Sequence, residues 1–404
     1  MKNVSYILLI IVFCIVLINC KKQELEVETV FLKNDSTIEK EMDVNTVPLI
    51  NDSLAENNVF EAKISVENIE KLPILFVLNG YFGYLNKELE IIIPPLFDRG
   101  YNYTDQGYTW IRHMNNRNEF ICMILDVEGK TLFQEYTSNI NILYDDIISY
   151  RSKNDNLFKI VRFRDNTVIA DKLGQEAIYS EDGVILVRNF YGSEWVFIDL
   201  YGKRILSDIT LYRNTKGFRE ERAVIIEGED REIKILNING DLYNYLDLYR
   251  TNWYFHEGLL AAQTTDGRTG YINRNGLFSF IVPIIPYEPD YQESPLNATD
   301  FNNGYALIQT IENPPVWRVI NNLGEYISNE LNISMASVFV DGLSCVKLYR
   351  GGYGYINTYG EMVIEPIFDS ADSFHRGYAR IVYQGRDGII NTEGKIYWSD
   401  EFIR

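Results

Sequence analysis

The sequence predicts an all-β protein of tandem units, each with three to four strands, that closes into a propeller-like toroid; an open β-solenoid is the alternative. The main observation is a turn phrase that recurs along the sequence: an apolar residue, then Asn or Asp, two variable residues and Gly. Successive copies lie 28 to 48 residues apart. A period of that size is typical of a repeat architecture rather than of a catalytic domain with one deep site. The phrases begin at Asn86, Asp126, Asp171, Asp199, Asn237, Asn273, Asn321, Asn357 and Asn391.

The complete unit is clearest near the C-terminus, where three short strands and two turns are predicted. The first strand, in Phe339–Val346, follows an aromatic-x-x-Gly turn, and the second, in Gly352–Gly360, ends in the Asn-x-x-Gly turn. The third, in Met362–Asp369, carries an Ile-x-Pro-x-Phe-Asp ending. Asn or Asp at the head of a turn accepts backbone hydrogen bonds, and Gly three residues later accommodates a positive φ. Leu89 takes the place of this Gly in the first phrase.

Other elements follow from the same pattern. Ile74–Leu78 is expected to be the first strand of the first unit, and Ile396–Trp398 the third strand of the last. Pro95 and Pro366 lack a backbone donor, so each third strand is expected at a sheet edge or at a bulge. Further first strands are predicted at 180–187, 218–225, 255–261, 301–308 and 374–381.

Two segments break the period and are expected to be insertions, Asn141–Asn166 and the Pro-rich Ile281–Asp300. Because rings usually have about four to eight blades, the closely spaced phrases of Asp171 and Asp199 are expected to share one blade. An open stack would need polar capping units, and none is recognisable in the sequence, which favours the ring.

The sequence resembles the WG-repeat (KWG) family of bacterial proteins. The best copies are Gly352–Val382 and Tyr81–Asp98, and Gly270–Asn273 is a partial match. In the dipeptide that names the family, the Trp is mostly replaced, as in Tyr353-Gly354 and Phe82-Gly83. The resemblance covers about Ile74 to Ile396. It implies an all-β repeat domain that serves as an interaction module, and it carries over no catalytic residues.

The N-terminus, residues 1–19, reads as a signal peptide, with Lys2 before an apolar run that is too short to span a bilayer comfortably. Leu17-Ile18-Asn19-Cys20 resembles a lipoprotein lipobox, which makes Cys20 the predicted lipidated residue. Asn19 departs from the small residue usual before that Cys. An uncleaved signal anchor, or ordinary cleavage with Cys20 incidental, is the alternative.

Three regions are therefore predicted: the signal peptide at 1–19, an acidic disordered tether at 20–72, and a WG-like repeat domain of about nine units at 73–404. A tether of this length spans roughly 40 Å. The net charge of −19 disfavours nucleic acid as a partner. We expect a lipid-anchored protein of the bacterial cell envelope, on the outer membrane because Lys21 rather than Asp follows the Cys.

No constellation of catalytic or metal-binding residues is recognisable, so neither enzymatic activity nor a cofactor or metal is expected. Cys122 and Cys345 occupy apolar slots of the repeat and are expected to be small buried side chains. The alternative is a glycan hydrolase on a propeller-like scaffold, with carboxylates that converge in one pocket. Its candidate acid pairs are Asp145-Asp146, Glu220-Glu221 and Glu229-Asp230.

Aromatic residues in irregular places are the predicted binding residues, as a platform for a sugar or a peptide. Four lie in the stretch Asp241–Phe255 and two in the Pro-rich segment: Tyr243, Tyr245, Tyr249, Trp253, Tyr287 and Tyr291. The competing interpretation is that they are interlayer core and exposed tyrosines. The sequence thus predicts a non-enzymatic, membrane-anchored repeat lipoprotein that mediates protein or glycan interaction.

Overall fold

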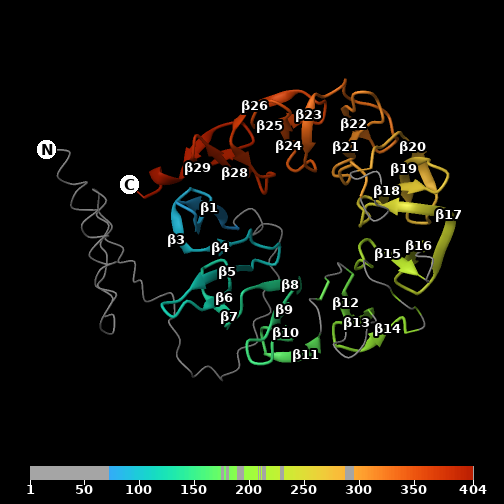
Figure 1. The fold of residues 1–404 in the computed structure, drawn as a ribbon. Coiled ribbons are helices and arrows are strands. Elements are labelled where there is room, and N and C mark those ends of the chain that lie inside the picture. The colour runs from blue at the N-terminus through green and yellow to red at the C-terminus, as the bar shows by residue number, and fades with distance from the viewer. Residues whose placement is uncertain are drawn as a thin grey trace. The chain divides into compact units, whose positions relative to one another are not determined.

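The computed structural model describes residues 72–173, 177–178, 182–188, 195–207, 209, 211, 215–227, 232–286 and 295–403. Cys20, the predicted signal peptide and nearly all of the predicted tether lie outside these residues, as do Tyr287 and Tyr291. The described part of the protein is built from short antiparallel strands joined by tight turns (Figure 1). None of its helices is long and apolar enough to cross a membrane.

Consecutive strands pair with one another, so that each sheet is a local segment of the sequence. The sheets of the N-terminal half are β1 (Ile74–Leu78), β2 (Tyr81–Leu85) and β3 (Ile91–Phe97); β4 (Arg99–Gly100), β5 (Thr109–Met114), β6 (Phe120–Leu125) and β7 (Thr131–Glu135); β8 (Ile140–Tyr144), β9 (Ile147–Arg151), β10 (Phe158–Arg162) and β11 (Thr167–Leu173); and β12 (Val184–Arg188), β13 (Trp195–Asp199) and β14 (Arg204–Ile205).

A six-stranded sheet follows, in which the long strand β17 joins two units. Its strands are β15 (Arg222–Glu227), β16 (Glu232–Asn237), β17 (Leu242–Thr251), β18 (Leu259–Thr264), β19 (Thr269–Asn273) and β20 (Phe278–Ile281). The remaining sheets are β21 (Tyr305–Gln309) and β22 (Trp317–Asn321); β23 (Ile333–Ala336), β24 (Leu343–Leu348), β25 (Tyr353–Asn357) and β26 (Met362–Phe368); and β27 (Ser370–Ala371), β28 (Tyr378–Tyr383), β29 (Arg386–Asn391) and β30 (Ile396–Trp398). A short 3-10 helix, η3 (Ser399–Glu401), follows β30.

Eight of the nine phrases form the expected tight turn; seven of these turns join two paired strands, and the one at Asn321 follows β22. At Asn357, for example, the Gly360 amide donates to the Asn357 carbonyl at 2.9 Å, and the Asn357 side-chain oxygen accepts the amides of Tyr359 and Glu361 at 3.0 Å each. The Asn357 side chain therefore accepts hydrogen bonds from two amides that, because of the tight turn, have no partner in a neighbouring strand.

Two predictions about the middle of the sequence are wrong. Asp171 lies within β11 rather than at a turn, and Asp199 begins the turn of a different sheet, so the two do not share a blade. The segment 141–166 is no insertion, because it supplies β9, β10 and most of β8 to a regular four-stranded sheet. The turn of that sheet is held instead by Asp165, whose carboxylate accepts the Thr167 amide at 2.9 Å.

The edge-strand prediction for Pro95 and Pro366 is confirmed. Strands β3 and β26 are sheet edges, and each shows register shifts against its neighbour. The bulge brings the third strand close to the Gly of the second: a Cβ on Gly354 would lie 2.6 Å from the Ile364 carbonyl oxygen and 2.8 Å from the Pro366 nitrogen. Only a residue without a side chain fits there.

Both faces of the inner strands are buried. In β18, Leu259 and Ala261 pack toward the following unit, whereas Leu260 and Ala262 pack toward the preceding one. This alternation follows from the two-residue period of a strand, and it explains why first strands are continuous apolar runs. Nine apolar clusters within the described residues follow one another along the sequence, each between one unit and the next.

The last of these clusters closes the ring. Phe76 and Leu85 of the first unit pack with Ile389 of the last, and the Phe76 and Phe402 rings meet edge to face at 5.6 Å. Strand β1 contacts β28, β29 and η3, and Figure 1 shows β1 beside β29. An open stack would leave its first and last units apart, so the protein is an all-β propeller-like ring and not a solenoid.

A buried tyrosine hydrogen bond reinforces several unit boundaries. The hydroxyls of Tyr84, Tyr271 and Tyr355 donate to the backbone carbonyls of Tyr101, Thr299 and Asp372 in the next unit, at 2.8, 3.1 and 2.8 Å. All three follow a Gly in the second strand. The Gly-Tyr pair of the repeat thus combines a close approach within one unit with a hydrogen bond to the next.

The prediction for the two cysteines is confirmed: Cys122 and Cys345 are free and buried. Burial raises the pKa of each thiol to about 12, so both stay protonated at neutral pH.

We predict that Gly354→Ala destabilises the domain by about 1–3 kcal/mol, because the new Cβ forces the third-strand backbone to shift. The matched control is Gly388→Ala in the last unit, where the nearest atoms to a Cβ lie at 3.1 Å. Urea unfolding followed by intrinsic fluorescence measures both. Equal midpoints for the two variants would contradict the packing argument.

Candidate functional site

Within the described residues, five turns at the start of first strands form a repeated polar feature of the ring; four are aromatic-x-x-Gly turns, and the first has Glu221 in place of the Gly. Their aromatic residues, all buried, are Phe218, Phe255, Phe301, Phe339 and Phe374. In the second, His256 and Leu259 exchange two backbone hydrogen bonds of 3.0 Å, and the two residues between them, Glu257 and Gly258, have φ of 53° and 77°. Such a turn leaves the two central amides without a partner inside the hairpin.

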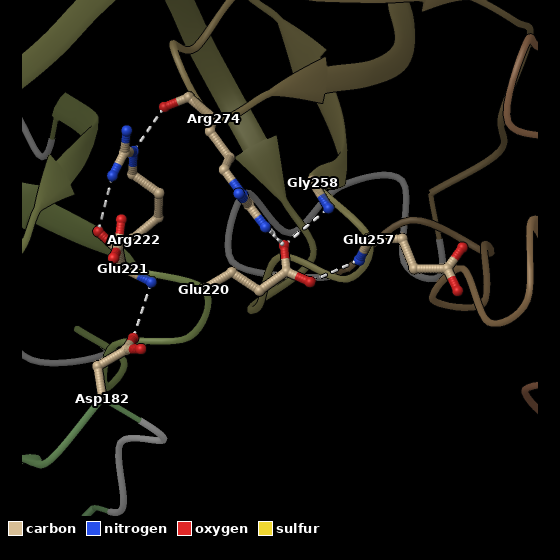
Figure 2. A network of polar contacts seen from close by, with 7 residues as sticks. All are labelled: Asp182, Glu220, Glu221, Arg222, Glu257, Gly258 and Arg274. Atoms are coloured by element: carbon tan, nitrogen blue, oxygen red, sulfur yellow. Dashed lines mark hydrogen bonds and ion pairs between the residues drawn. The ribbon is translucent and has the colours of Figure 1, made fainter.

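The missing partner comes from the preceding turn. Glu220 accepts the amides of Glu257 and Gly258, both at 2.7 Å, through its two carboxylate oxygens (Figure 2). Glu257 in turn accepts the amides of Asn303 and Gly304, at 2.5 and 2.8 Å. Charge-assisted hydrogen bonds of this length are among the strong ones in proteins. These two turns therefore each bind the carboxylate of the turn before them.

Aspartate does the same with one amide instead of two, as its shorter side chain allows. Asp182 accepts the Glu221 amide at 2.8 Å, and Asp341 accepts the Gly377 amide at 2.7 Å. In the last unit the slot holds Arg376, which donates to the Tyr103 carbonyl at 3.0 Å and to Asp105 at 2.5 Å. The polar contacts thus also link the end of the ring to its second unit.

Glu220 is the most heavily bonded of these acids. Besides the two amides it binds Arg274 at 3.0 Å, and Arg222 reaches the Arg274 carbonyl at 2.8 Å (Figure 2). Burial alone raises the pKa of Glu220, but the hydrogen bonds from Gly258, Arg274 and Glu257 outweigh burial, so the pKa lies below its usual 4.5. Glu220 is therefore ionised at neutral pH and committed to structure.

A cavity of about 410 Å³ lies where the last unit meets the first two. Its lining includes apolar residues of β1 and charged residues of the last unit: Leu72, Pro73, Ile74, Leu75, Lys87, Asn102, Asp372, Ser373, His375, Arg376, Tyr378, Ala379, Arg380 and Ile389. Asp372, its one carboxylate, accepts a hydrogen bond from Arg380 at 2.7 Å. Burial and the neighbouring Arg376 lower the pKa of His375, so its imidazole is neutral at pH 7.

Two candidate acids of the hydrolase alternative, Glu220 and Asp146, are bound by other groups of the protein. The acids of the pair Glu220-Glu221 are separated in role, since Glu220 binds the neighbouring turn and Glu221 is exposed. Asp146 of another pair lies 2.8 Å from Arg162. The third pair, Glu229-Asp230, falls outside the described residues. Within those residues no three His, Cys, Asp or Glu side chains gather closely enough for a metal ion.

The predicted binding residues of the aromatic stretch lie on and just after β17, away from the cavity lining. Tyr243 and Tyr245 have ring centroids 6.3 Å apart, and Tyr245 is 65% exposed. Tyr249 is half-buried beside its neighbour Arg250. The guanidinium group of Arg222 lies over the Tyr243 ring, with its central carbon 5.4 Å from the ring centre. The structure therefore brings Tyr243 and Tyr245 together as an adjacent pair.

Trp253 follows β17 and lies two residues before Phe255, which begins the turn that binds Glu220. The Lys216 ammonium is 4.3 Å from the centre of its ring, and burial lowers the pKa of this lysine. One ring face is thus covered by a cation, which is a stabilising contact when the pair is partly removed from water.

Sequence reasoning missed the bonds between turns. The third slot of the turn holds Asp182, Glu220, Glu257 and Asp341 at corresponding places. An acid at the same position of four turns was the available signal. The bonding partner could not be found in this way, because it lies 36 to 47 residues further along the sequence.

Comparison with known families identifies the repeat. The family described as "WG containing repeat" matches residues 82–117 and 353–386, which confirms the predicted WG-type repeats at the two places where the sequence copies are best. No curated protein matches the sequence.

Solved structures resemble the protein at low sequence identity. BamB from Moraxella catarrhalis is 10% identical, with a TM-score of 0.35, and the match covers 80% of this chain and 94% of that one. The C-terminal WD40 domain of Sif2 is 10% identical, with a TM-score of 0.41 and coverage of 72% and 93%. An uncharacterized protein from Listeria monocytogenes EGD-e is 10% identical, with a TM-score of 0.37 and coverage of 75% and 94%.

We predict that Glu220→Gln lowers the free energy of unfolding at pH 7 by about 1–3 kcal/mol, because it replaces a charge-assisted acceptor of two amides and an arginine. Since the folded pKa is lowered, the stabilisation from Glu220 is complete above the ordinary pKa of 4.5 and is lost as the pH falls through the folded value.

The difference in unfolding free energy between the native protein and Glu220→Gln should therefore shrink as the pH drops below 4.5. Denaturant titrations from pH 7 to pH 3 measure it. Glu221→Gln is the matched control, as it removes the same charge from the adjacent, exposed residue. A Glu220 effect that is no larger than the control, or is constant with pH, would contradict the assigned role.

Proposed function

We propose that the protein is a non-enzymatic interaction protein of the bacterial cell envelope, tethered by a lipid on Cys20, whose repeat ring binds a protein or glycan partner. The observation that carries the proposal is the use of the acidic turn residues. In the described part of the ring, Glu220, Glu257 and Asp341 are bound to backbone amides of the next unit, and Asp146 pairs with Arg162 of its own sheet. A repeat ring whose acidic turn residues hold neighbouring units together is suited to serve as a binding scaffold.

We propose that the partner binds at the pair Tyr243 and Tyr245 on β17. Tyr245 is largely exposed, and Leu242 on the same strand is 38% exposed. Tyrosines supply large, rigid contact area together with a hydroxyl for hydrogen bonding, which suits both peptide and sugar ligands. The β17 face therefore offers an amphipathic platform.

For the partner, we predict that Tyr245→Ala reduces capture from envelope extract at least tenfold relative to the unsubstituted protein. The matched control is Tyr359→Ala, because Tyr359 is 64% exposed and lies on a turn of another unit. The protein is immobilised, and captured material is quantified by mass spectrometry or glycan analysis. Treatment of the extract with protease or with glycosidase shows whether the captured partner is a protein or a glycan. Equal capture by both variants would exclude the β17 face.

For the anchor, we predict that Cys20→Ala moves the protein from the membrane fraction to the soluble fraction. Lipidation of the thiol supplies the membrane affinity, and the substitution removes the acceptor atom. Labelling with a radioactive or clickable fatty acid provides the chemical readout, and Cys14→Ala is the matched control in the same segment. Unchanged partitioning with no label on Cys20 would reject lipidation.

A further inference from the structure

The bonds between turns follow one rule. In four turns the third residue is an acid that extends to the next turn, where its carboxylate accepts backbone amides. A glutamate holds two amides, as Glu220 and Glu257 do, and an aspartate holds one, as Asp182 and Asp341 do. In two of these turns both central amides bind a carboxylate and in the other two one amide does, at 2.5–2.8 Å.

One of the five turns receives no such carboxylate from the turn before it. Asp341 and Gly342 form the centre of the turn after Phe339, with φ of 52° and 79°, and Val340 and Leu343 exchange backbone hydrogen bonds of 2.9 and 3.0 Å as in the other turns. The preceding turn, however, supplies Asn303 instead of an acid. Within the described residues neither the Asp341 amide nor the Gly342 amide has a hydrogen-bond partner.

The two amides are also accessible. Asp341, Gly342 and Asn303 are all exposed, whereas Gly258 and Gly304 of the carboxylate-bound turns are partly buried. Paired backbone amides in a left-handed turn form a concave anion site, and here that site faces solvent.

We propose that the Asp341–Gly342 turn is a binding site for a carboxylate of a ligand, which takes the position that Glu220 and Glu257 occupy in the neighbouring turns. The acidic side chain of Asp341 does not oppose this, because Glu257 is itself an acid in the corresponding slot and its amide still binds Glu220. Unlike a glutamate in this slot, Asn303 carries side-chain NH₂ donors.

This site deepens the proposed function, on which its biological role rests, by naming the chemistry of the group that a partner presents. An acidic residue of a peptide, a free peptide C-terminus and an acidic sugar share this chemistry. The protein has a net negative charge, so a specific pair of oriented amides, rather than general electrostatic attraction, has to supply the selectivity.

The test uses the full-length protein in mild detergent, labelled with [15N]glycine and titrated with glutarate, with neutral glutaramide as the probe control. The Gly342 amide signal, assigned by its loss in Gly342→Asn, should shift with glutarate and not with glutaramide. The Gly258 and Gly304 signals should stay in place, because Glu220 and Glu257 already hold these amides. An amidated peptide with one Glu and an acid-free peptide with a free C-terminus distinguish the two peptide sources.

Substitutions at Asn303 test whether a carboxylate from within the protein competes with glutarate for the site. Asn303→Glu should fill the site from within the protein, raise the midpoint of thermal unfolding and weaken glutarate binding at least tenfold. Glutamate fits there, since Glu257 has a φ of 53° against 52° for Asn303. Asn303→Asp should have an intermediate effect, and the neutral Asn303→Gln should keep binding within about threefold of the unsubstituted protein.

A Gly342 signal that does not respond to glutarate, that responds equally to glutaramide, or that responds unchanged in Asn303→Glu would overturn the site. So would equal shifts of Gly258, Gly304 and Gly342, which indicate an ionic effect only. If partner capture through Tyr245 persists while Gly342 is silent, the site fails and the proposed function stands. If Gly342 responds and no partner is captured, the proposed function fails and the site stands.

Discussion

Burial of both faces of every sheet is the constraint on which this ring depends. A single unit of three or four short strands has apolar residues on two faces and covers neither by itself. Leu260 and Ala262 of β18 need the preceding unit, and Leu259 and Ala261 need the following one. The demand passes from unit to unit until Ile389 of the last meets Phe76 of the first. Closure is therefore the way in which the terminal units avoid an exposed apolar face.

Apolar packing alone is tolerant of sliding, and the polar contacts between units remove that freedom. Tyr355 fixes the depth of one unit against the next through its bond to the Asp372 carbonyl, and Glu257 fixes the turns through two amides of the following unit. Each contact needs a donor and an acceptor within about 3 Å, so a small shift between sheets breaks it. The tyrosines lie in the buried layer and the acids at the turns, and together they define the register between units.

The sequence predicts local structure in this protein much better than contacts between units. Eight turns were recognisable because their geometry is decided within four residues by Asn or Asp and Gly. Asp171 shows the limit of that signal. It begins a phrase of the expected kind but lies within β11, and the turn that joins β10 to β11 is at Asp165. The supposed insertion at 141–166 failed for a related reason: β9 and β10 are regular strands whose turns lack the usual phrase.

The candidate site could be predicted only in part. Tyr243 and Tyr245 were found from composition, and their adjacency on β17 follows from strand geometry. The bond between Glu220 and the turn at Gly258 could not be derived, because it depends on how one sheet is placed against the next, which the ring as a whole decides. The same holds for the cavity, whose walls come from the first two units and the last.

Departures from a repeat rule carry more information than the rule. Four turns show what their amides bind, so the turn with Asn303 before it can be interpreted as the same site without its internal ligand. Arg376 is the other departure, where a cation replaces the acid and joins the last unit to Asp105 of the second. One substitution opens an anion site and the other ties the ring together. A repeat protein can thus acquire both a binding position and a closing contact by changing the third residue of a turn, without altering the fold that presents them.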